Sequence, residues 1–362
     1  MKKLLAILLV MAIAITSSFA NGNTESSSAS SKKVIKVGAL IRNQNEQFVK
    51  NYADNLKVLA DKAGIELNLQ DAMGDQAKQL DQLNMLITRG YKYFVIIPVD
   101  TSATEQMTKK INEVGGGAAF SNIQPSVSAL KVGKTFFYAS SPEVVAGQFQ
   151  ANILDEYFKA NPAKNPDKVL NLLYIEGRLG HPAQISREVG FIDQSKQLGY
   201  TVNFIAKDTA NWTPDMAQEK MDTWIAAHDG KFNAVIAQND GMALGAVESL
   251  ITHGLTNSDA SDGTILSVPV IGIDGTADGL KSMDSDKLYG TVLQDSLGQS
   301  ATAFDLVATM AQGKVAYGMT ANGIAPSTQV IDELPANDPS IIGQCYLVPF
   351  KPITKANYKD FM

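Results

Sequence analysis

Residues 168–199 read "KVLNLLYIEGRLGHPAQISREVGFIDQSKQLG", and this stretch decides the fold of the chain. An apolar run of strand length comes first, a polar loop with glycines follows, and the remainder has helical spacing. Strand and helix patterns of the same kind alternate before and after it. Such alternation is typical of an α/β fold, in which helices cover both faces of a parallel sheet.

The alternation runs through one half of the chain and then starts again. In the first half, 34–41 and 91–100 have the length and apolarity of buried strands, and 46–64 has apolar residues at helical spacing. The second half repeats the pattern from 144 to 295. Two doubly wound parallel sheets in 362 residues predict a clamp of two lobes. In such sheets ligands lie outside the carboxyl ends of the strands, where the loops gather.

Composition limits the class of partner. Hydrophobic residues make up 45% of the chain, charged residues 19%, and the formal net charge is −6. Nucleic acid and anionic membrane surfaces both need concentrated positive charge, so this acidic balance argues against either as a partner. Cys345 is the only cysteine, which rules out an intramolecular disulfide. Its apolar surroundings predict a packed small side chain rather than a nucleophile.

The N-terminus has the features of an export signal. Lys2 and Lys3 precede an apolar run at 4–15, and a small-residue site ends at Ala20, after which we expect cleavage and a periplasmic protein. The apolar run is shorter than the ~20 residues that a membrane span needs, which favours export over an anchor helix. The Ser-rich residues 21–33 are expected to form a flexible leader.

Polar side chains follow the predicted strands at their carboxyl ends. For any one of them the simpler interpretation is a turn or helix N-cap, which Asn and Asp favour anyway. Five such positions in register favour a common site instead, with Gly177 and Gly180 allowing a sharp turn that presents the second of them. The positions are Asn122, His181 with Arg187, Asn239 with Asp240, Asp274, and Gln294 with Asp295.

The chemistry of this set points to a sugar. Amides, carboxylates and a guanidinium suit hydroxyl groups, each of which donates and accepts a hydrogen bond. The rings of Phe48 and Trp212 are available to cover the apolar faces of a pyranose. The sequence has no Gly-rich phosphate loop and no Cys/His metal cluster, so we expect neither a cofactor nor a metal.

A more specific signal comes from five blocks of the second half. They are "GRLGHPAQISR" (177–187), "DTANWTPDMAQEKMDTW" (208–224), "VIAQNDGMALGAVESL" (235–250), "VPVIGIDG" (268–275) and "GTVLQDSLGQSATAFDLVATMAQGK" (290–314). These blocks strongly resemble the periplasmic galactose/glucose-binding proteins, and the similarity runs from about Val34 to the C-terminus. The resemblance implies two Rossmann-like lobes, joined by three hinge strands, that close over one monosaccharide and deliver it to an ABC permease. It implies no catalysis, and it divides the chain into 34–138 with 296–333 and 139–295 with 334–362.

Position by position, the resemblance implies roles for single residues. Phe48 and Trp212 would lie on the two faces of the sugar ring. Three positions depart from the family: Glu46 and Ala183 each stand where it has Asp, and Gln294 where it has Asn. The first two departures imply an altered recognition at the sugar C4 and more room at C1. Hydrogen bonds would come from Asn122, His181, Arg187, Asn239 and Asp274.

Two substitutions provide an early expectation about this set. We expect Asp274→Ala and Arg187→Ala to weaken sugar binding strongly, because each would leave a charge-assisted bond without its partner. Folding should be little affected by either change.

The family commonly carries a calcium loop, which by position is Ala163 to Asn171 completed by Asn233. Here Ala163 cannot supply a carboxylate, Lys168 replaces the turn glycine, and Asn233 replaces a bidentate Glu. The resemblance therefore implies weak or no calcium binding. Lys168 or loop packing would then perform the structural role.

Other functions share parts of this pattern. A glycosidase would use His181 as base and Asp274 or Glu46 as acid, but neither a nucleophile elbow nor a metal set accompanies them. A sugar-responsive transcription regulator would need a basic helix-turn-helix before Val34, where this chain has an export signal. Contact with a chemoreceptor can coexist with transport. The ligand itself can be another sugar, such as a pentose or a C1-substituted glycoside, and we expect a monomer.

Overall fold

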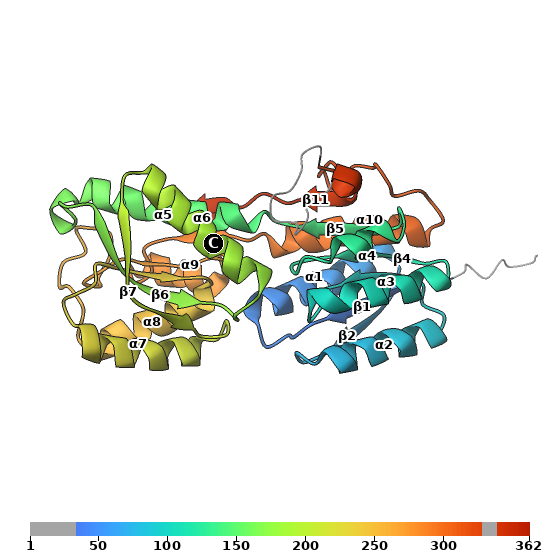
Figure 1. Ribbon diagram of the computed structural model, residues 1–362, viewed down its shortest axis with the longest axis horizontal. Helices are drawn as coiled ribbons and strands as arrows, with labels where there is room; N and C mark the ends of the chain where they lie inside the picture. The colour runs from blue at the N-terminus through green and yellow to red at the C-terminus, as the bar shows by residue number, and fades with distance from the viewer. Residues whose placement is uncertain (1–33, 328–338) are drawn as a thin grey trace, which may run out of the picture. The chain divides into compact units, whose positions relative to one another are not determined.

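A computed structural model describes residues 34–327 and 339–362 (Figure 1). The expected signal sequence at 1–20 and the leader at 21–33 therefore lie outside the described residues. In the described part, strands and helices alternate along the chain, and the sheets that carry the fold are parallel. The predicted α/β class is confirmed.

The first sheet has the strand order β11-β5-β4-β3-β1-β2 in the described part of the chain. All of its strand pairs are parallel. Its inner strand β1 is an almost continuous apolar run because both faces of the sheet are covered. The strands are β1 (Lys36–Ile41), β2 (Glu66–Asp71), β3 (Tyr93–Ile96), β4 (Gly117–Phe120), β5 (Phe136–Ser140) and β11 (Cys345–Leu347).

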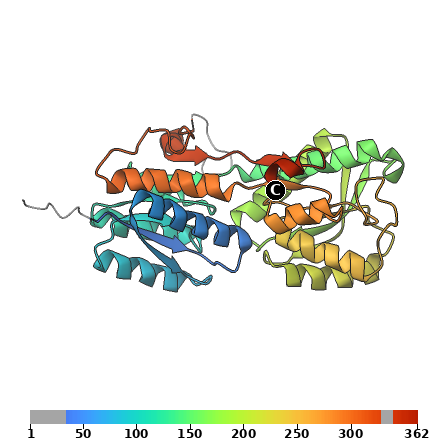
Figure 2. The same ribbon diagram turned by 180° about the vertical axis from the view of Figure 1, so that it is seen from behind.

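Helices cover both faces of this sheet. On one face α1 and α10 lie side by side, blue and orange in Figure 2, and share a core with the strands. On the other face Leu83, Met107 and Leu130 bring α2, α3 and α4 onto the same strands. The helices are α1 (Gln47–Ala63), α2 (Gln76–Thr88), α3 (Thr104–Glu113), α4 (Val127–Lys131) and α10 (Ser296–Ala311).

The second sheet has the order β7-β6-β8-β9, again with parallel pairing. Helices α5 and α6 contribute to the core on one face, and α7, α8 and α9 to the core on the other. The strands are β6 (Val169–Glu176), β7 (Thr201–Thr209), β8 (Ala234–Ala237) and β9 (Val270–Ile271). The helices are α5 (Glu143–Ala160), α6 (Pro182–Gln197), α7 (Pro214–His228), α8 (Asp240–Thr252) and α9 (Ala277–Asp284).

A small antiparallel sheet pairs β10 (Thr291–Leu293) with β12 (Lys351–Ile353). Strand β11, by contrast, pairs with β5 of the first sheet, so residues 345–347 do not lie with the second lobe as the predicted segment 334–362 implied. Burial in β11 raises the pKa of the Cys345 thiol to about 12, as expected for a packed side chain. Short 3-10 helices lie at Thr101–Ala103, Pro162–Lys164, Pro339–Gln344 and Tyr358–Phe361.

Among residues 34–327 and 339–362, no helix combines the length and the apolarity that crossing a bilayer requires.

Candidate ligand-binding site

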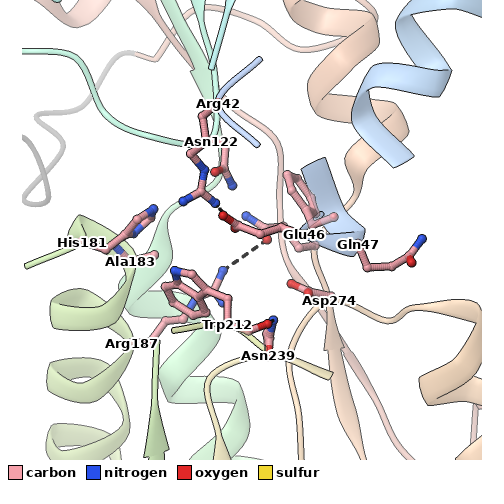
Figure 3. A pocket seen from close by; sticks show the side chains of 12 residues that line it. Arg42, Glu46, Gln47, Asn122, His181, Ala183, Arg187, Trp212, Asn239 and Asp274 are labelled. Atoms are coloured by element: carbon pink, nitrogen blue, oxygen red, sulfur yellow. Dashed lines mark hydrogen bonds and ion pairs between the residues drawn. The ribbon is translucent and has the colours of Figure 1, made fainter. Parts of the chain in front are cut away.

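A pocket lies at the carboxyl ends of strands from both main sheets (Figure 3). Its lining residues all follow a strand: β1, β4, β6, β7, β8, β9 or β10. The structure thus brings together every residue that the sequence predicted to bind the ligand. Ala183 also lines the pocket, and so do Arg42 and Gln47, which the sequence did not indicate. The predicted residues are Glu46, Phe48, Asn122, His181, Arg187, Trp212, Asn239, Asp274 and Gln294.

Two aromatic side chains line the pocket, and each follows a strand of a different main sheet. Phe48 lies in the first turn of α1 and Trp212 follows β7, and each exposes only 8% of its surface. The guanidinium of Arg187 lies 5.6 Å from the centre of the Trp212 ring, and the His181 ring meets the indole edge to face at 5.3 Å. These contacts fix the orientation of the indole within the wall of the pocket.

Arg187 belongs to a closed network at one side of the pocket. Its Nε donates to Glu143 at 2.8 Å, and its Nη2 donates to Gln294 Oε1 at 3.2 Å. Gln294 in turn donates to Glu143 at 3.1 Å, and a further Arg187 nitrogen donates to the Gln238 carbonyl. Both charges of the pair are buried, so removing Arg187 alone would cost Glu143 this ion pair. The expectation that Arg187→Ala leaves folding nearly unchanged is therefore not supported.

A second ion pair joins Arg42 to Glu46 at the start of α1. Arg42 exposes 4% of its side chain, and burial lowers the pKa of its guanidinium. Burial raises the pKa of Glu46, and the Arg42 charge opposes that rise. The Nε and Nη1 atoms of Arg42 are buried and have no hydrogen-bond partner among the described residues. These two donors are therefore available to a ligand.

His181 is held as a neutral donor. It precedes α6, and its Nδ1 accepts a hydrogen bond from the Ala183 backbone N–H at 3.1 Å, which places the ring proton on Nε2. Burial lowers the pKa of His181 well below its usual value, and the nearby Arg42, Arg178 and Arg187 lower it further. The Nε2–H is buried without a partner in the described part of the chain. His181 can donate to a ligand but cannot serve as the base of a glycosidase.

Backbone strain gathers at the pocket. Asn122, Trp212 and Asp274 have φ angles of +59°, +68° and +127°, a region that side chains other than glycine rarely adopt. Such strain persists only where the surrounding structure enforces it, and it clusters at functional sites. It is an indication of function that the strand and helix patterns did not contain.

Asp274 presents an acceptor to the pocket. Its carboxylate accepts no hydrogen bond from any described residue, although it exposes only 7% of its surface. Burial raises the pKa of Asp274 well above its usual value, Arg187 opposes the rise, and Asp240 adds to it. A ligand hydroxyl that donates to this carboxylate would stabilise its charged form.

The simpler N-cap interpretation is correct for some of the strand-end residues. Asn239 accepts from the Met242 N–H at 2.9 Å and so caps α8, while it also lines the pocket. Asp295 caps α10 through the Gly298 N–H at 2.7 Å. Asp240 lies outside the pocket, where its carboxylate accepts from the backbone and side chain of Thr276. Asp240 and Asp295 thus serve the scaffold.

One hydrogen bond next to the site joins loops of the two main sheets. Arg178, in the loop after β6, donates from Nη2 to the carbonyl of Val99 after β3, at 3.2 Å. Arg178, Val99 and His181 also line a neighbouring hollow. The ligand pocket is therefore bordered by a direct contact between segments that are 79 residues apart in sequence.

The loop that corresponds to a calcium site is closed by protein hydrogen bonds. Asn233 donates to the Val169 carbonyl at 2.8 Å and accepts from the Asn171 N–H at 2.9 Å. Lys168 adopts φ +54°, and its ammonium lies 5.6 Å from the centre of the Tyr200 ring. Among the described residues, no group of three or more His, Cys, Asp or Glu side chains could hold a metal ion.

Comparison with known proteins places this geometry in a family. The model of the periplasmic binding protein domain matches residues 37–315. The chain is 29% identical over 298 residues to the D-galactose/methyl-galactoside binding periplasmic protein of Haemophilus influenzae, covering 80% of this chain and 86% of the relative. It is also 29% identical over 300 residues to the ribose import binding protein of Escherichia coli, covering 82% and 89%.

A solved structure agrees in fold. The ABC transporter solute binding protein from Bacillus halodurans, determined with bound myo-inositol, superposes with a TM-score of 0.70 at 24% identity, covering 90% of this chain and 96% of that one. The family model spans most of the described residues and both main sheets apart from strand β11. The chain therefore belongs to the periplasmic binding protein family, whose members bind solutes and are not enzymes.

Proposed function

We propose that the chain captures a monosaccharide of the galactose or glucose kind in the periplasm and delivers it to an ABC permease. The observation that carries this proposal is the pocket itself, in which residues from seven strand ends converge. Its partnerless donors on Arg42 and His181 and the acceptor on Asp274 suit hydroxyl groups, and Phe48 and Trp212 suit the apolar faces of a sugar ring.

The names of the relatives support a sugar and leave its identity open. One of them binds D-galactose and methyl-galactoside and another imports ribose. In this chain Glu46 is longer than the family Asp and is held by Arg42. We therefore propose unequal affinity for the epimers glucose and galactose, with a pentose or a C1-substituted glycoside as the alternative ligand.

The test is isothermal titration of the purified protein with glucose, galactose, xylose, arabinose and ribose. We expect saturable one-to-one binding of at least one hexose, and no consumption of the sugar after prolonged incubation. Failure of every sugar to bind at millimolar concentration would overturn the proposal. Binding of a pentose alone would shift it to the alternative ligand.

Delivery and partners follow from this assignment. We propose the predicted division into two lobes, except that 345–347 lie in the first sheet, and a monomeric protein exported by cleavage after Ala20. The sugar-loaded protein would bind the membrane subunits of its permease, and a chemoreceptor is a second partner that a loaded clamp can engage. Cross-linking of the loaded and empty protein to its permease in membranes tests the first of these contacts.

A further inference from the structure

Gln238 is a buried side chain that lies outside the pocket and makes hydrogen bonds with both ends of its amide. It follows β8 directly, is fully buried and does not line the pocket. Its Oε1 accepts from the backbone N–H of Gly177 at 2.8 Å. Its Nε2 donates to the carbonyl of Gln184 at 2.8 Å and to the hydroxyl of Tyr174 at 3.2 Å. The cost of burying this amide is therefore offset by three hydrogen bonds.

The partners of Gln238 require an amide in one orientation. A backbone N–H only donates and a carbonyl only accepts, so Gly177 needs the Oε1 atom and Gln184 needs the Nε2 atom. A carboxylate at this position would lack the two donors. An apolar side chain of the same volume would remove the acceptor from the N–H of Gly177, which is itself buried. Hydrogen bonding, and not volume, therefore determines the residue type at this position.

The Gln238 amide joins the two ends of the loop that carries His181. Gly177 begins this loop, directly after β6, and Gln184 lies in the first turn of α6. Residues 177–184 are thus held at both ends by a single side chain from β8, the neighbouring strand in the sheet. The place of the His181 ring in the pocket depends on these two bonds.

The same amide supports Trp212 through Gly177. The glycine leaves no room for a side chain beside the indole, so any shift of its backbone moves the ring. Its carbonyl accepts from the hydroxyl of Thr209 at 2.6 Å, and with the bond to Gln238 both of its backbone groups are held. The next residue, Asn239, donates to the Trp212 carbonyl at 3.2 Å. Two consecutive residues therefore hold the ring and the backbone of Trp212, whose φ of +68° needs such support.

The backbone of Gln238 contacts one more residue of the pocket. Its carbonyl accepts a hydrogen bond from the guanidinium of Arg187. One residue outside the pocket thus acts on three that line it. It acts on Arg187 directly, on Trp212 through Gly177, and on His181 through the ends of its loop.

We propose that Gln238 is a positioning residue of the ligand site, which sets the places of Trp212 and His181 and thereby the affinity for the ligand. This inference deepens the proposed function and rests on it, because it assumes that a sugar occupies the pocket. A residue that only stabilises the fold changes the free energy of unfolding and leaves the affinity of the folded protein unchanged. A positioning residue changes both quantities.

Gln344 provides a matched control. It is also buried, and its amide donates to three backbone carbonyls beside the first sheet, those of Leu130, Gly133 and Phe136. Neither Gln344 nor these partners line the pocket. Gln344→Met and Gln238→Met therefore make the same chemical change and each remove three hydrogen bonds, but only the second change affects supports of the pocket.

The first test is isothermal titration of the parent and both variants with glucose and with galactose. We expect Gln238→Met to weaken the tighter of the two sugars at least tenfold and Gln344→Met to stay within twofold of the parent. Urea unfolding should show a loss of stability in both variants. Parent-like affinity in Gln238→Met would overturn the inference and leave the sugar-binding function intact. Absence of binding in the parent would instead overturn the proposed function.

A spectroscopic test needs no sugar. In a Trp224→Phe background Trp212 is the only indole of the chain, so the emission reports its surroundings. Gln238→Met should shift the emission maximum of the sugar-free protein to longer wavelength, because a displaced ring gains contact with water. Gln344→Met should leave the maximum in place. An unshifted spectrum in folded Gln238→Met would overturn the support of Trp212 by Gln238.

Two smaller changes keep the test decisive if methionine is not tolerated at this position. Gln238→Asn keeps an amide but is one methylene shorter, so it cannot reach Gly177 and Gln184 together, and it should weaken binding at least threefold. Tyr174→Phe removes the third partner and keeps both bonds to the loop, so the affinity should stay within twofold of the parent. Equal affinity losses in these two variants, or none in Gln238→Asn, would overturn the role assigned to the loop bonds.

Discussion

Gly177 lies directly against the indole of Trp212, so close that a methyl group on its Cα would overlap the ring. The glycine was expected to provide a sharp turn, but the turn belongs to Gly180, which has φ +76°. Gly177 provides space instead. The Cα of Gly177, in the loop after β6, therefore supports the Trp212 ring that lines the pocket.

This contact predicts that alanine substitutions at Gly177 and Gly180 have different effects. Gly177→Ala should displace Trp212 and weaken sugar binding at least tenfold. Gly180→Ala should cost about 1 kcal/mol of stability through its positive φ, but no atom within 4 Å opposes the new side chain, so affinity should change little. Titration calorimetry and urea unfolding of both variants measure the two effects. Equal affinity in the two variants would contradict the role given to Gly177.

Trp212 should report ligand binding by fluorescence. Trp212→Phe removes the indole fluorophore, so it should abolish most of the sugar-induced change in emission. Trp212→Ala also removes the stacking surface, so it should in addition weaken binding. Trp224 is the matched control, because it lies on α7 outside the pocket. A full fluorescence response that survives in Trp212→Phe, or disappears in Trp224→Phe, would show that the indole does not contact the sugar.

Asp274 and Arg187 should respond to substitution in opposite ways. Asp274→Gly should abolish tight binding and yet stabilise the fold, since it relieves a strained φ of +127° that costs about 1–3 kcal/mol. Arg187→Met should lower the free energy of unfolding by about 3–5 kcal/mol, because Glu143 would be buried without its partner. Adding Glu143→Gln should recover much of that loss. Urea unfolding of the single and double variants decides between these outcomes.

The buried carboxylate of Asp240 should give the fold an unusual pH dependence. Burial raises its pKa from 3.8 to about 6. The folded state therefore binds the proton more tightly than the unfolded chain does, and the stability contributed by protonation is lost as the pH rises from 3.8 to about 6. The shift corresponds to on the order of 3 kcal/mol.

The measurement compares Asp240→Asn with the parent protein by urea unfolding at pH 4.5 and pH 7. Relative to the parent, the variant should be more stable at pH 7 than at pH 4.5, because its amide does not titrate. Asp278→Asn, at an exposed position, should follow the parent at both pH values. A constant difference between Asp240→Asn and the parent would refute the assigned pKa.

The loop around Asn233 should make calcium unnecessary. The Asn233 amide bridges the Val169 carbonyl and the Asn171 N–H, so these groups are satisfied by the protein. The melting temperature should therefore be the same, within a few degrees, in excess chelator and in millimolar calcium. Asn233→Ala should lower the stability by about 1–3 kcal/mol in both, since two backbone groups lose their partner. A calcium-dependent melting temperature in the parent would contradict this assignment.

Sequence patterns predicted the fold class because apolar runs locate the strands between the helices. They predicted the pocket because the carboxyl ends of parallel strands meet at one edge of a sheet. Arg42 carries the same signal, directly after β1, but an arginine in a turn was not recognised as buried. Glu143 was missed because β5, which it follows, was not recognised as a strand. The pairing of Glu143 with Arg187 depends on a tertiary contact, which periodicity does not contain.

The hydrogen bond from Arg178 to Val99 affects the lowest sugar concentration at which the protein can bind its ligand. It ties loops of the two main sheets directly, and a bond of this kind favours the arrangement in which it forms by about 1 kcal/mol. Where that arrangement is the one that binds the sugar and is the minor state, apparent affinity rises with its population, by about fivefold for this bond. A cell that carries this arginine should therefore begin to feed from a more dilute medium than one in which alanine replaces it.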